Sequence, residues 1–327
     1  MRAMIYTGYG PPDVLHLTEV EKPVPGDDDV LVRVQATQVT AADIRARGSN
    51  FPGLFWIPAR VIFGVRGPKK TILGTNFAGE VEAVGRNVTR FKAGDAVFGS
   101  TGGEFGAYAE YLCLPEDAGM VAKPENISYE EAAAIPFGAQ TALFFLRDKG
   151  NIQSGQHVLI YGASGAVGTA AVQLAKHFGA EVTGVCSTRN LDLVTSLGAD
   201  RVIDYTQEDF TRGDQTYDLI FETVGKSSVS GGMSVLKDGG IYLANLIGPA
   251  VLVRMLSNSI VGSKKMVSGI ASDDRESLEF LSTLVEAGDL KPVIDRTYPF
   301  EQIADAHRYA DTGRKRGNVV ITLDHDN

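Results

Sequence analysis

Three glycines in one turn are the residues whose type and spacing most clearly predict chemistry. Gly162, Gly165 and Gly168 follow the apolar run HVLIY and precede a stretch with helical periodicity. Glycines in such a turn permit a tight bend and let the backbone approach a pyrophosphate, which the free N–H groups and the dipole of the following helix stabilise. The spacing GxxGxxG also suits an ordinary turn, but the strand before it and the helix after it favour a dinucleotide site. The predicted contacts are Gly162, Ala163, Ser164, Gly165, Ala166, Val167 and Gly168.

The end of the next apolar run indicates which dinucleotide is bound. Sites selective for NAD usually carry Asp or Glu about 20 residues after the glycines, where it binds the ribose hydroxyls. This sequence has Cys186, Ser187, Thr188 and Arg189 there. Hydroxyls and a guanidinium suit a 2′-phosphate, because they form charge-assisted hydrogen bonds with it. We therefore predict NADPH as the cofactor, with Ser187 and Arg189 as contacts, although Arg189 also suits a solvent-facing position at a helix start.

Changes in the sequence pattern divide the chain into two predicted domains that must position these residues. Residues 1–122 alternate short apolar and polar runs between Gly and Pro turns, which is typical of a β-rich, barrel-like domain. Residues 123–269 alternate apolar runs with helical stretches, which predicts an α/β domain with a doubly wound parallel sheet. Residues 270–327 contain a helical stretch and a final apolar run, and we expect them to return to the first domain.

Charge and composition argue against several other classes of protein. The 327-residue chain has a formal net charge of -9, which disfavours sequence-independent binding to nucleic acid. Cys113 and Cys186 lie in apolar runs without ligand spacing, so we predict neither a disulfide framework nor a metal cluster. No run of about 18 apolar residues is present, and the N-terminal residues lack the apolar middle region of a secretory signal. We expect a cytoplasmic protein without a membrane span.

Several motifs in the sequence together resemble one known family. They are ILGTNFAGEVEAVG, FKAGDAVFG, GAYAEYL, YGASGAVG and SLGADRVIDY. In this order they resemble the medium-chain dehydrogenase/reductase superfamily, and within it the zinc-independent quinone oxidoreductase branch. The resemblance covers nearly the whole chain. It implies a GroES-like catalytic domain, a Rossmann domain that binds NADPH, and a homodimer formed through an edge of the Rossmann sheet.

Three positions of this resemblance bear on metal binding. Zinc-dependent members of the superfamily place ligands where this chain has Thr40, Thr75 and Phe137. None of these is a good ligand, because zinc prefers thiolate, imidazole or carboxylate. The four-cysteine lobe of those members is also missing, and the five histidines show no paired ligand spacing. We therefore predict no metal.

Hydride transfer to an acceptor that is already electron-poor is the reaction that fits a site without zinc. Quinones and α,β-unsaturated carbonyls, such as enones and 2-alkenals, are acceptors of this kind, and the cofactor supplies the hydride. Thr40 and Asn76 are our candidates for lining the nicotinamide end, although both also suit hydrogen bonds within the β-rich domain. An NADPH-binding regulatory or structural protein is the alternative, and a zinc alcohol dehydrogenase is a third interpretation.

The resemblance also implies further contacts with the cofactor. Thr141 resembles the threonine beside the nicotinamide, and Tyr205 resembles the tyrosine that flanks the 2′-phosphate. Each also suits a packing role, Thr141 inside a helix and Tyr205 at the end of a core strand. The segment LANLIGP follows the fifth predicted strand, so its backbone should pass near the carboxamide. Its predicted contacts are Leu243, Leu246 and Ile247.

An aromatic segment between residues 50 and 70 bears on the acceptor. Phe51 and Trp56 stand there among prolines and glycines, in a region where this superfamily builds a wall of its substrate cleft. An apolar wall suits a flat hydrophobic acceptor, since small-molecule sites are mostly apolar. The same residues would equally suit a loop packed against the core of the β-rich domain.

Overall fold

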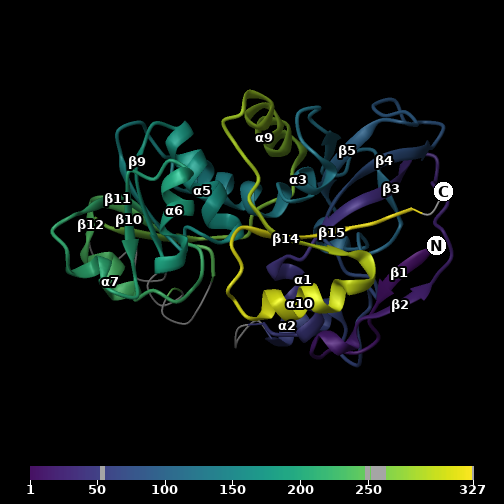
Figure 1. Ribbon diagram of the computed structural model, residues 1–327, viewed down its shortest axis with the longest axis horizontal. Coiled ribbons are helices and arrows are strands. Elements are labelled where there is room, and N and C mark those ends of the chain that lie inside the picture. Colours follow the sequence, from purple (N-terminus) through teal and green to yellow (C-terminus); the bar gives the residue numbers. More distant parts are fainter. Residues whose placement is uncertain (52–55, 247–250, 252–262, 326–327) are drawn as a thin grey trace. The chain divides into compact units, whose positions relative to one another are not determined.

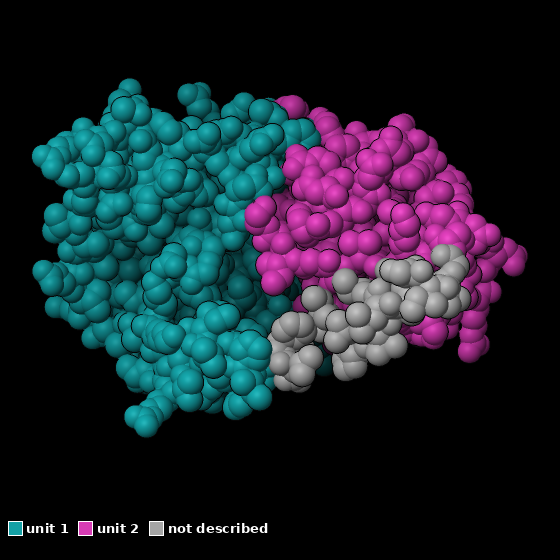
Figure 2. Space-filling model, turned by 180° about the vertical axis from the view of Figure 1, so that it is seen from behind, with its two compact units in different colours: residues 1–137, 273–286, 292–327 teal, residues 138–272, 287–291 magenta. Residues whose placement is uncertain are grey.

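The structure is a computed structural model that describes residues 1–51, 56–246, 251 and 263–325 (Figure 1). Contacts between Cα atoms divide the chain into two units (Figure 2). The first unit comprises Met1–Phe137, Asp273–Glu286 and Pro292–Asn327. The second comprises Gly138–Ser272 and Ala287–Lys291.

The two units differ from the predicted domains at their edges. Helix α3 (Tyr129–Ala133) packs against strands of the first unit, so this unit continues past the predicted boundary at residue 122. Residues 287–291 join the second unit, because the Gln173 side chain holds the backbone of Lys291. Gln173 Nε2 donates to the Lys291 carbonyl at 3.0 Å, and its Oε1 accepts from the Lys291 N–H at 2.8 Å.

A mixed sheet of seven strands forms the body of the first unit. The strand order is β14, β15, β3, β4, β5 and β7, with β6 paired to β3, and β1 pairs separately with β2. The strands are β1 (Arg2–Ile5), β2 (His16–Glu19), β3 (Asp29–Gln38), β4 (Asn76–Val84), β5 (Ala96–Ser100), β6 (Tyr111–Pro115), β7 (Met120–Ala122), β14 (Ile294–Pro299) and β15 (Asn318–Thr322). The helices are α1 (Ala41–Gly48), α2 (Trp56–Phe63), α3, α9 (Arg275–Ala287) and α10 (Ile303–Asp311).

Strand β3 organises this unit because it pairs with three neighbours. It runs antiparallel to β4, β6 and β15. Its residues Val30, Val32 and Val34 are fully buried. The pairing of β15 with β3 brings the last strand of the chain back to the first unit, which agrees with the expected return of the final apolar run.

A sheet of six parallel strands forms the second unit, which confirms the predicted doubly wound fold. The strand order is β10, β9, β8, β11, β12, β13, the 3-2-1-4-5-6 order of dinucleotide-binding sheets. The strands are β8 (His157–Tyr161), β9 (Glu181–Cys186), β10 (Arg201–Asp204), β11 (Tyr217–Glu222), β12 (Leu236–Ala244) and β13 (Lys265–Ser268). The helices are α4 (Thr141–Leu143), α5 (Ala166–His177), α6 (Leu191–Ser196) and α7 (Val229–Ser234). Within the described residues, no helix is long and apolar enough to cross a membrane.

The crossover connections of this sheet run on both of its faces. Helices α5 and α6 join β8 to β9 and β9 to β10, and α7 joins β11 to β12 on the return path. Right-handed crossovers therefore place α5 and α6 on one face and α7 on the other. The connection from β10 to β11 contains only a short 3₁₀ turn, Phe210–Arg212. A loop therefore connects β10 to β11, where folds of this class usually have a full helix.

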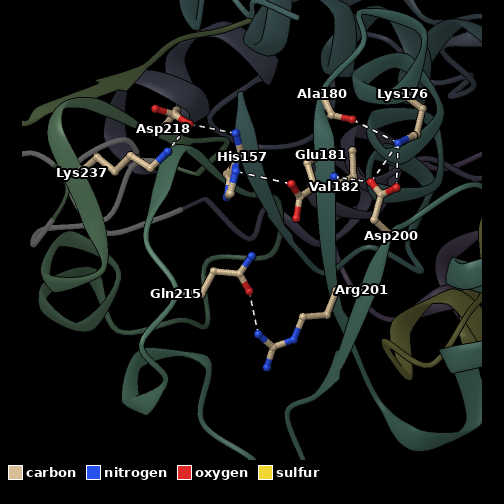
Figure 3. A network of polar contacts seen from close by, with 10 residues as sticks. All are labelled: His157, Lys176, Ala180, Glu181, Val182, Asp200, Arg201, Gln215, Asp218 and Lys237. Atoms are coloured by element: carbon tan, nitrogen blue, oxygen red, sulfur yellow. Dashed lines mark hydrogen bonds and ion pairs between the residues drawn. The ribbon is translucent and has the colours of Figure 1, made fainter. Parts of the chain in front are cut away.

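The amino ends of these parallel strands are joined by polar contacts (Figure 3). Asp218 accepts hydrogen bonds from the His157 N–H and from Lys237 Nζ, both at 2.8 Å. Asp200 accepts from the Val182 N–H at 2.7 Å and from Lys176 Nζ at 2.8 Å. The two carboxylates thus link neighbouring strands at their amino ends. The glycine turn lies at the opposite, carboxyl ends of the strands.

Candidate functional site

The glycine turn lies between β8 and α5, and its three glycines have different roles. Gly162 has a φ of 82°, and a Cβ there would lie 2.2 Å from the Val224 side chain. A Cβ at Gly168 would lie 2.1 Å from the carbonyl oxygen of Gly162. A Cβ at Gly165 would meet nothing closer than that oxygen at 3.5 Å, an ordinary contact. The turn itself requires Gly162 and Gly168, whereas Gly165 leaves open space at the start of the helix.

The start of α5 has the properties of an anion site. Gly165 is its N-cap residue, and the first turn contains no acidic side chain. The first four N–H groups of a helix have no acceptor within it, and the helix dipole favours a negative charge beside them. Open space at Gly165 therefore coincides with main-chain donors that suit a phosphate.

Asn190 joins the glycine turn to the end of β9, and sequence reasoning missed it. Its Nδ2 donates to Ser164 Oγ at 2.9 Å and to Ser187 Oγ at 3.3 Å. The side chain is buried, with 4% of its surface exposed. Because Asn190 donates to both serines, each hydroxyl keeps its own hydrogen to donate elsewhere. In the sequence, Asn190 stands at the start of α6, where an asparagine reads as a helix cap.

A carboxylate reaches the end of β9 from the neighbouring strand. Asp204 ends β10 and lies opposite Cys186 in the parallel register. Its carboxylate accepts a hydrogen bond from Thr188 Oγ1 and two from Thr206, the N–H at 2.9 Å and Oγ1 at 2.7 Å. The hydrogen bond from Thr188 is the main cause that holds the pKa of Asp204 below its usual value. The end of β9 itself carries no acid, but the folded chain places one beside it.

Tyr205 and Arg189 lie on the surface at this end of the sheet. Arg189 is exposed, and Tyr205 is 53% exposed, which does not fit the core position that was the alternative for it. The Tyr205 ring lies 6.3 Å from the ring of Tyr161, the residue before the glycine turn. A pocket of about 820 Å³ begins beside these two rings and continues under the β10–β11 connection, with Phe210 and Lys226 in its lining. The exposed tyrosine therefore lies near the residue that precedes the glycine turn, and it lines this pocket.

The segment of Thr141 approaches the glycine turn from a different part of the chain. A Cβ at Gly138 would lie 2.6 Å from the Ala166 carbonyl oxygen, so only glycine permits this approach. Helix α4, which Thr141 begins, packs against α5. Thr141 is partly buried there. The structure thus brings Thr141 to the same helix that opens the predicted cofactor site.

The three predicted contacts after the fifth strand are placed differently from one another. Leu243 lies within β12 and is fully buried, so its side chain belongs to the core. Leu246 follows the strand and is partly buried. Ile247 lies outside the described residues. Only the main-chain groups of Leu243 can therefore contact a cofactor. The sequence likewise predicts a main-chain contact for this segment.

In the first unit, Thr40 belongs to a buried cluster of hydroxyl and carboxyl groups. It caps α1, and its hydroxyl hydrogen-bonds Asp43 Oδ2 at 2.5 Å and Thr75 Oγ1 at 3.1 Å. Asp43 also accepts from the Gly74 N–H at 2.9 Å. Burial raises the pKa of Asp43 to about 6, although these donors oppose the shift. The cluster therefore combines a capping role with a carboxyl group that titrates near neutrality.

A buried histidine lies on the far side of this cluster. His307 Nδ1 is 3.0 Å from Arg47 Nη1, and His307 Nε2 is 3.0 Å from the Tyr108 hydroxyl. Since arginine only donates, Nδ1 accepts and Nε2 carries the hydrogen. Burial and the Arg47 charge lower the pKa of His307 to about 3, so the ring is neutral. Asp43 in turn helps to raise the pKa of Tyr108 well above its ordinary value, after burial itself.

Asn76 lies at the start of β4 and is fully buried. Its side-chain amide hydrogen-bonds Gln38 Oε1 at 3.0 Å, and Gln38 Nε2 donates to Asn318 Oδ1 at 2.8 Å. Three amides from β4, β3 and β15 therefore form one chain across the sheet. This placement favours the alternative interpretation of Asn76, in which its side chain forms hydrogen bonds within the β-rich unit.

The aromatic segment has one partly buried ring and one exposed ring. Phe51 stacks on Phe63 with ring centroids 5.2 Å apart, and Phe63 meets the buried Phe105 at 5.9 Å. Trp56 is 48% exposed on α2. The exposed face of α2 also carries Ile57, Val61 and Ile62. Phe51 thus fits the packing alternative, whereas Trp56 lies in an exposed apolar face.

Comparisons with known proteins agree with this architecture. Residues 26–125 match the family described as alcohol dehydrogenase GroES-like domain, and residues 197–321 match the family described as zinc-binding dehydrogenase. The chain is 35% identical to 2-methylene-furan-3-one reductase of Solanum lycopersicum, over 98% of this chain and 79% of that protein. It belongs to the medium-chain dehydrogenase/reductase superfamily, in the quinone-oxidoreductase-like branch.

Two further relatives lie in the same superfamily. The chain is 31% identical to the chloroplastic NADPH-dependent alkenal/one oxidoreductase of Arabidopsis thaliana, over 98% of this chain and 79% of that protein. The solved structure of the quinone oxidoreductase from Coxiella burnetii is similar with a TM-score of 0.88 and 28% identity, over 99% of each chain. The GroES-like and Rossmann fold predicted from the resemblance is therefore confirmed.

The zinc named in one of these family descriptions does not fit the residues of this chain. Thr40 and Thr75, at two of the ligand positions, hydrogen-bond each other at 3.1 Å. Hydroxyls are poor ligands beside thiolate, imidazole or carboxylate, and Asp43 is already bonded to Thr40 and Gly74. Within the described part of the chain, no three His, Cys, Asp or Glu side chains are grouped to hold a metal ion. No catalytic step is therefore derived through zinc.

Proposed function

We propose that the chain is a zinc-independent oxidoreductase that transfers hydride from NADPH to a quinone or an α,β-unsaturated carbonyl. The observation that carries this proposal is the open, acid-free helix start at Gly165, together with the hydroxyls of Ser164 and Ser187 that Asn190 joins. The printed names of the relatives support it, since they describe a furanone reductase, an NADPH-dependent alkenal/one oxidoreductase and a quinone oxidoreductase.

Each end of the cofactor has proposed contacts in the second unit. The turn from Gly162 to Gly168 and the start of α5 would bind the pyrophosphate. Ser187, Arg189 and Tyr205 would hold the 2′-phosphate end. Thr141 and the main chain of Leu243 and Leu246 would orient the nicotinamide. NADPH, when bound, supplies the hydride.

Thr40 is a better-supported candidate than Asn76 for handling the proton that the reaction consumes. Its hydroxyl lies between Asp43 and Thr75, and Asp43 has a pKa of about 6. A carboxyl group with such a pKa exchanges protons near neutral pH, and the Thr40 hydroxyl can pass them on. Asn76 has no group that titrates, and its amide is engaged with Gln38.

The acceptor would be apolar and flat. Trp56 and its neighbours on α2 offer an exposed apolar surface, which suits a quinone or an enone better than a sugar or an acid. We propose the first unit as the substrate side and the second as the cofactor side.

We further propose a cytoplasmic homodimer. Strand β13 ends the six-stranded sheet and has β12 as its only neighbour in the described residues, and edge strands are ready sites of pairing. Light scattering at micromolar concentration measures the dimer, and a monomer there would contradict it. Cell fractionation tests the location.

The test of the function is an assay with purified protein. NADPH oxidation is followed at the nicotinamide absorbance with quinones, enones, 2-alkenals and simple aldehydes, each with and without a chelator, and again with NADH. We expect turnover with quinones or enones that survives chelation. Tight binding of NADPH without turnover on any acceptor would contradict an enzyme and favour a regulatory protein. Turnover with simple aldehydes that a chelator abolishes would contradict zinc independence.

A further inference from the structure

The two hydroxyls at the end of β9 have different hydrogen-bond partners. Ser187 accepts from Asn190 Nδ2, so its own hydrogen remains available. Thr188 donates its hydrogen to Asp204 Oδ2. A hydroxyl has one hydrogen and two lone pairs. Toward a ligand, Ser187 therefore offers a donor and Thr188 offers only an acceptor.

These two polarities suit different forms of the adenosine ribose. A 2′-phosphate accepts hydrogen bonds, so it matches the Ser187 hydrogen and the Arg189 guanidinium. A 2′-hydroxyl has a hydrogen to donate, so it matches the lone pairs of Thr188. The sequence suggested two hydroxyl donors for a phosphate, but the structure leaves only one of them as a donor.

Asp204 also contributes its charge. The hydrogen bonds from Thr188, Thr206 and Gln207 keep its pKa low, so the carboxylate is ionised at neutral pH. It lies one strand away from the end of β9, because Asp204 is paired in register with Cys186. Adjacent strands are about 4.8 Å apart. A negative charge at the end of the neighbouring strand repels a 2′-phosphate bound at the end of β9 and leaves an uncharged 2′-hydroxyl unaffected.

We propose that Asp204, acting through Thr188, limits the preference for NADPH so that the protein binds both NADPH and NADH. Asp204 is a specificity-determining residue that works against Arg189. The proposal rests on the proposed function, because it requires a nicotinamide cofactor at the glycine turn.

The experiment compares cofactor binding in three proteins. Dissociation constants for NADPH and NADH are measured by titration of the wild type, Asp204→Asn and Asp218→Asn, without any acceptor. Asparagine at 204 removes the charge and lets its amide donate to Thr188, whose hydrogen then becomes available to a phosphate. Asp218→Asn makes the same change of net charge at the opposite end of the sheet, so it controls for general electrostatic effects.

We expect the wild type to bind both cofactors and Asp204→Asn to increase the preference for NADPH about 5-fold, as for removal of one partly screened charge. The increase should shrink at high ionic strength, and Asp218→Asn should leave the ratio unchanged. If Asp204→Asn does not fold, Thr188→Val is used, and its NADH affinity should fall relative to its NADPH affinity.

Three results would overturn the proposal. They are a ratio unchanged in Asp204→Asn, an equal rise in Asp218→Asn, and a wild type that binds NADPH but not NADH. A wild type that binds neither cofactor would overturn the proposed function and this proposal with it. Failure of the function is thus distinguished from failure of the proposal alone.

Discussion

The two ends of the parallel sheet in the second unit use polar groups in opposite ways. At the amino ends, Asp200 and Asp218 are each bonded to a lysine and to a main-chain N–H of a neighbouring strand (Figure 3). At the carboxyl ends, Asn190 aims the hydrogens of Ser164 and Ser187 away from itself. The first arrangement satisfies charges within the chain, and the second leaves donors for a ligand.

This difference separates two roles within one sheet: groups at the amino ends contribute to stability, and groups at the carboxyl ends contribute to binding. Ligands of open α/β sheets bind beyond the carboxyl ends of the strands, where helices begin and their main-chain donors are free. The amino ends receive the carboxyl ends of the helices and offer no such donors. Changes at the carboxyl ends should therefore act on cofactor binding, and changes at the amino ends on stability.

The largest expected effect comes from a glycine that serves both purposes. Gly168→Ala places a Cβ 2.1 Å from the Gly162 oxygen, so we expect a loss of about 3 kcal/mol in the free energy of unfolding or more. Gly165→Ala is the matched control, because its Cβ meets only an ordinary contact at 3.5 Å. It should cost about 1 kcal/mol or less, because alanine is a poorer N-cap residue than glycine, yet weaken NADPH binding.

Urea unfolding and NADPH titration of both glycine variants measure this contrast. An unstable Gly165→Ala or a stable Gly168→Ala would contradict the assignment of roles within the turn.

Arg189→Ala should have the next largest effect, and only on binding. Arg189 is exposed, and a hydrogen bond to a charged partner contributes about 1.5 to 3 kcal/mol. We expect NADPH to bind about 10- to 100-fold more weakly and NADH to change little. Titration with both cofactors measures this. An equal loss for the two would mean that Arg189 does not contact the 2′-phosphate.

Asn190→Ala tests whether NADPH binding requires Asn190 to orient the hydroxyl groups of Ser164 and Ser187. Without the amide, the hydroxyls of Ser164 and Ser187 rotate freely, and we expect NADPH to bind about 5-fold more weakly, which is a loss near 1 kcal/mol. Ser164→Ala with Ser187→Ala serves as the comparison, since Asn190→Ala should add nothing to that double variant. A further loss there would show that Asn190 acts through another contact.

The smallest effect is expected at the amino ends. Partial burial opposes ionisation of Asp218, but hydrogen bonds from Lys237 and His157 outweigh it and hold the pKa below its usual value. A lowered carboxyl pKa adds stability that is present above the unfolded pKa of about 4 and is lost as the pH falls further. Asp218→Asn should remove about 1 kcal/mol at pH 7 and nothing at a pH below both values.

Unfolding free energies of the wild type and Asp218→Asn across this acid range check the sign. A difference that grows toward low pH would contradict it, and so would any change in the NADPH dissociation constant at pH 7.

Local sequence was enough to predict the turn and the parallel sheet. Apolar runs such as HVLIY form strands because both faces of a parallel sheet are buried, and glycines permit the tight turn that follows. These signals lie within a few residues of one another. The apolar runs around Val158, Val182, Val202, Leu219 and Ile241 accordingly lie in β8 to β12.

Contacts between distant segments could not be read in this way. Asp204 reaches Thr188 through strand register, Asn190 reaches Ser164 through the packing of α6 beside the turn, and Asp43 reaches Gly74 across the first unit. Each pair is joined by one or two hydrogen bonds, and no local pattern marks them. The burial of the Leu243 side chain within β12 likewise follows from the sheet as a whole and not from its neighbours in the sequence.

The sequence by itself determined the superfamily, through its motifs. It also determined the two kinds of sheet and the glycine turn, because periodicity and glycine spacing act over short distances. Only the tertiary structure decided which hydroxyls donate and which accept, and which carboxyl groups are charged. The direction of a hydrogen bond and the pKa of an acid depend on partners that the fold brings together from separate strands.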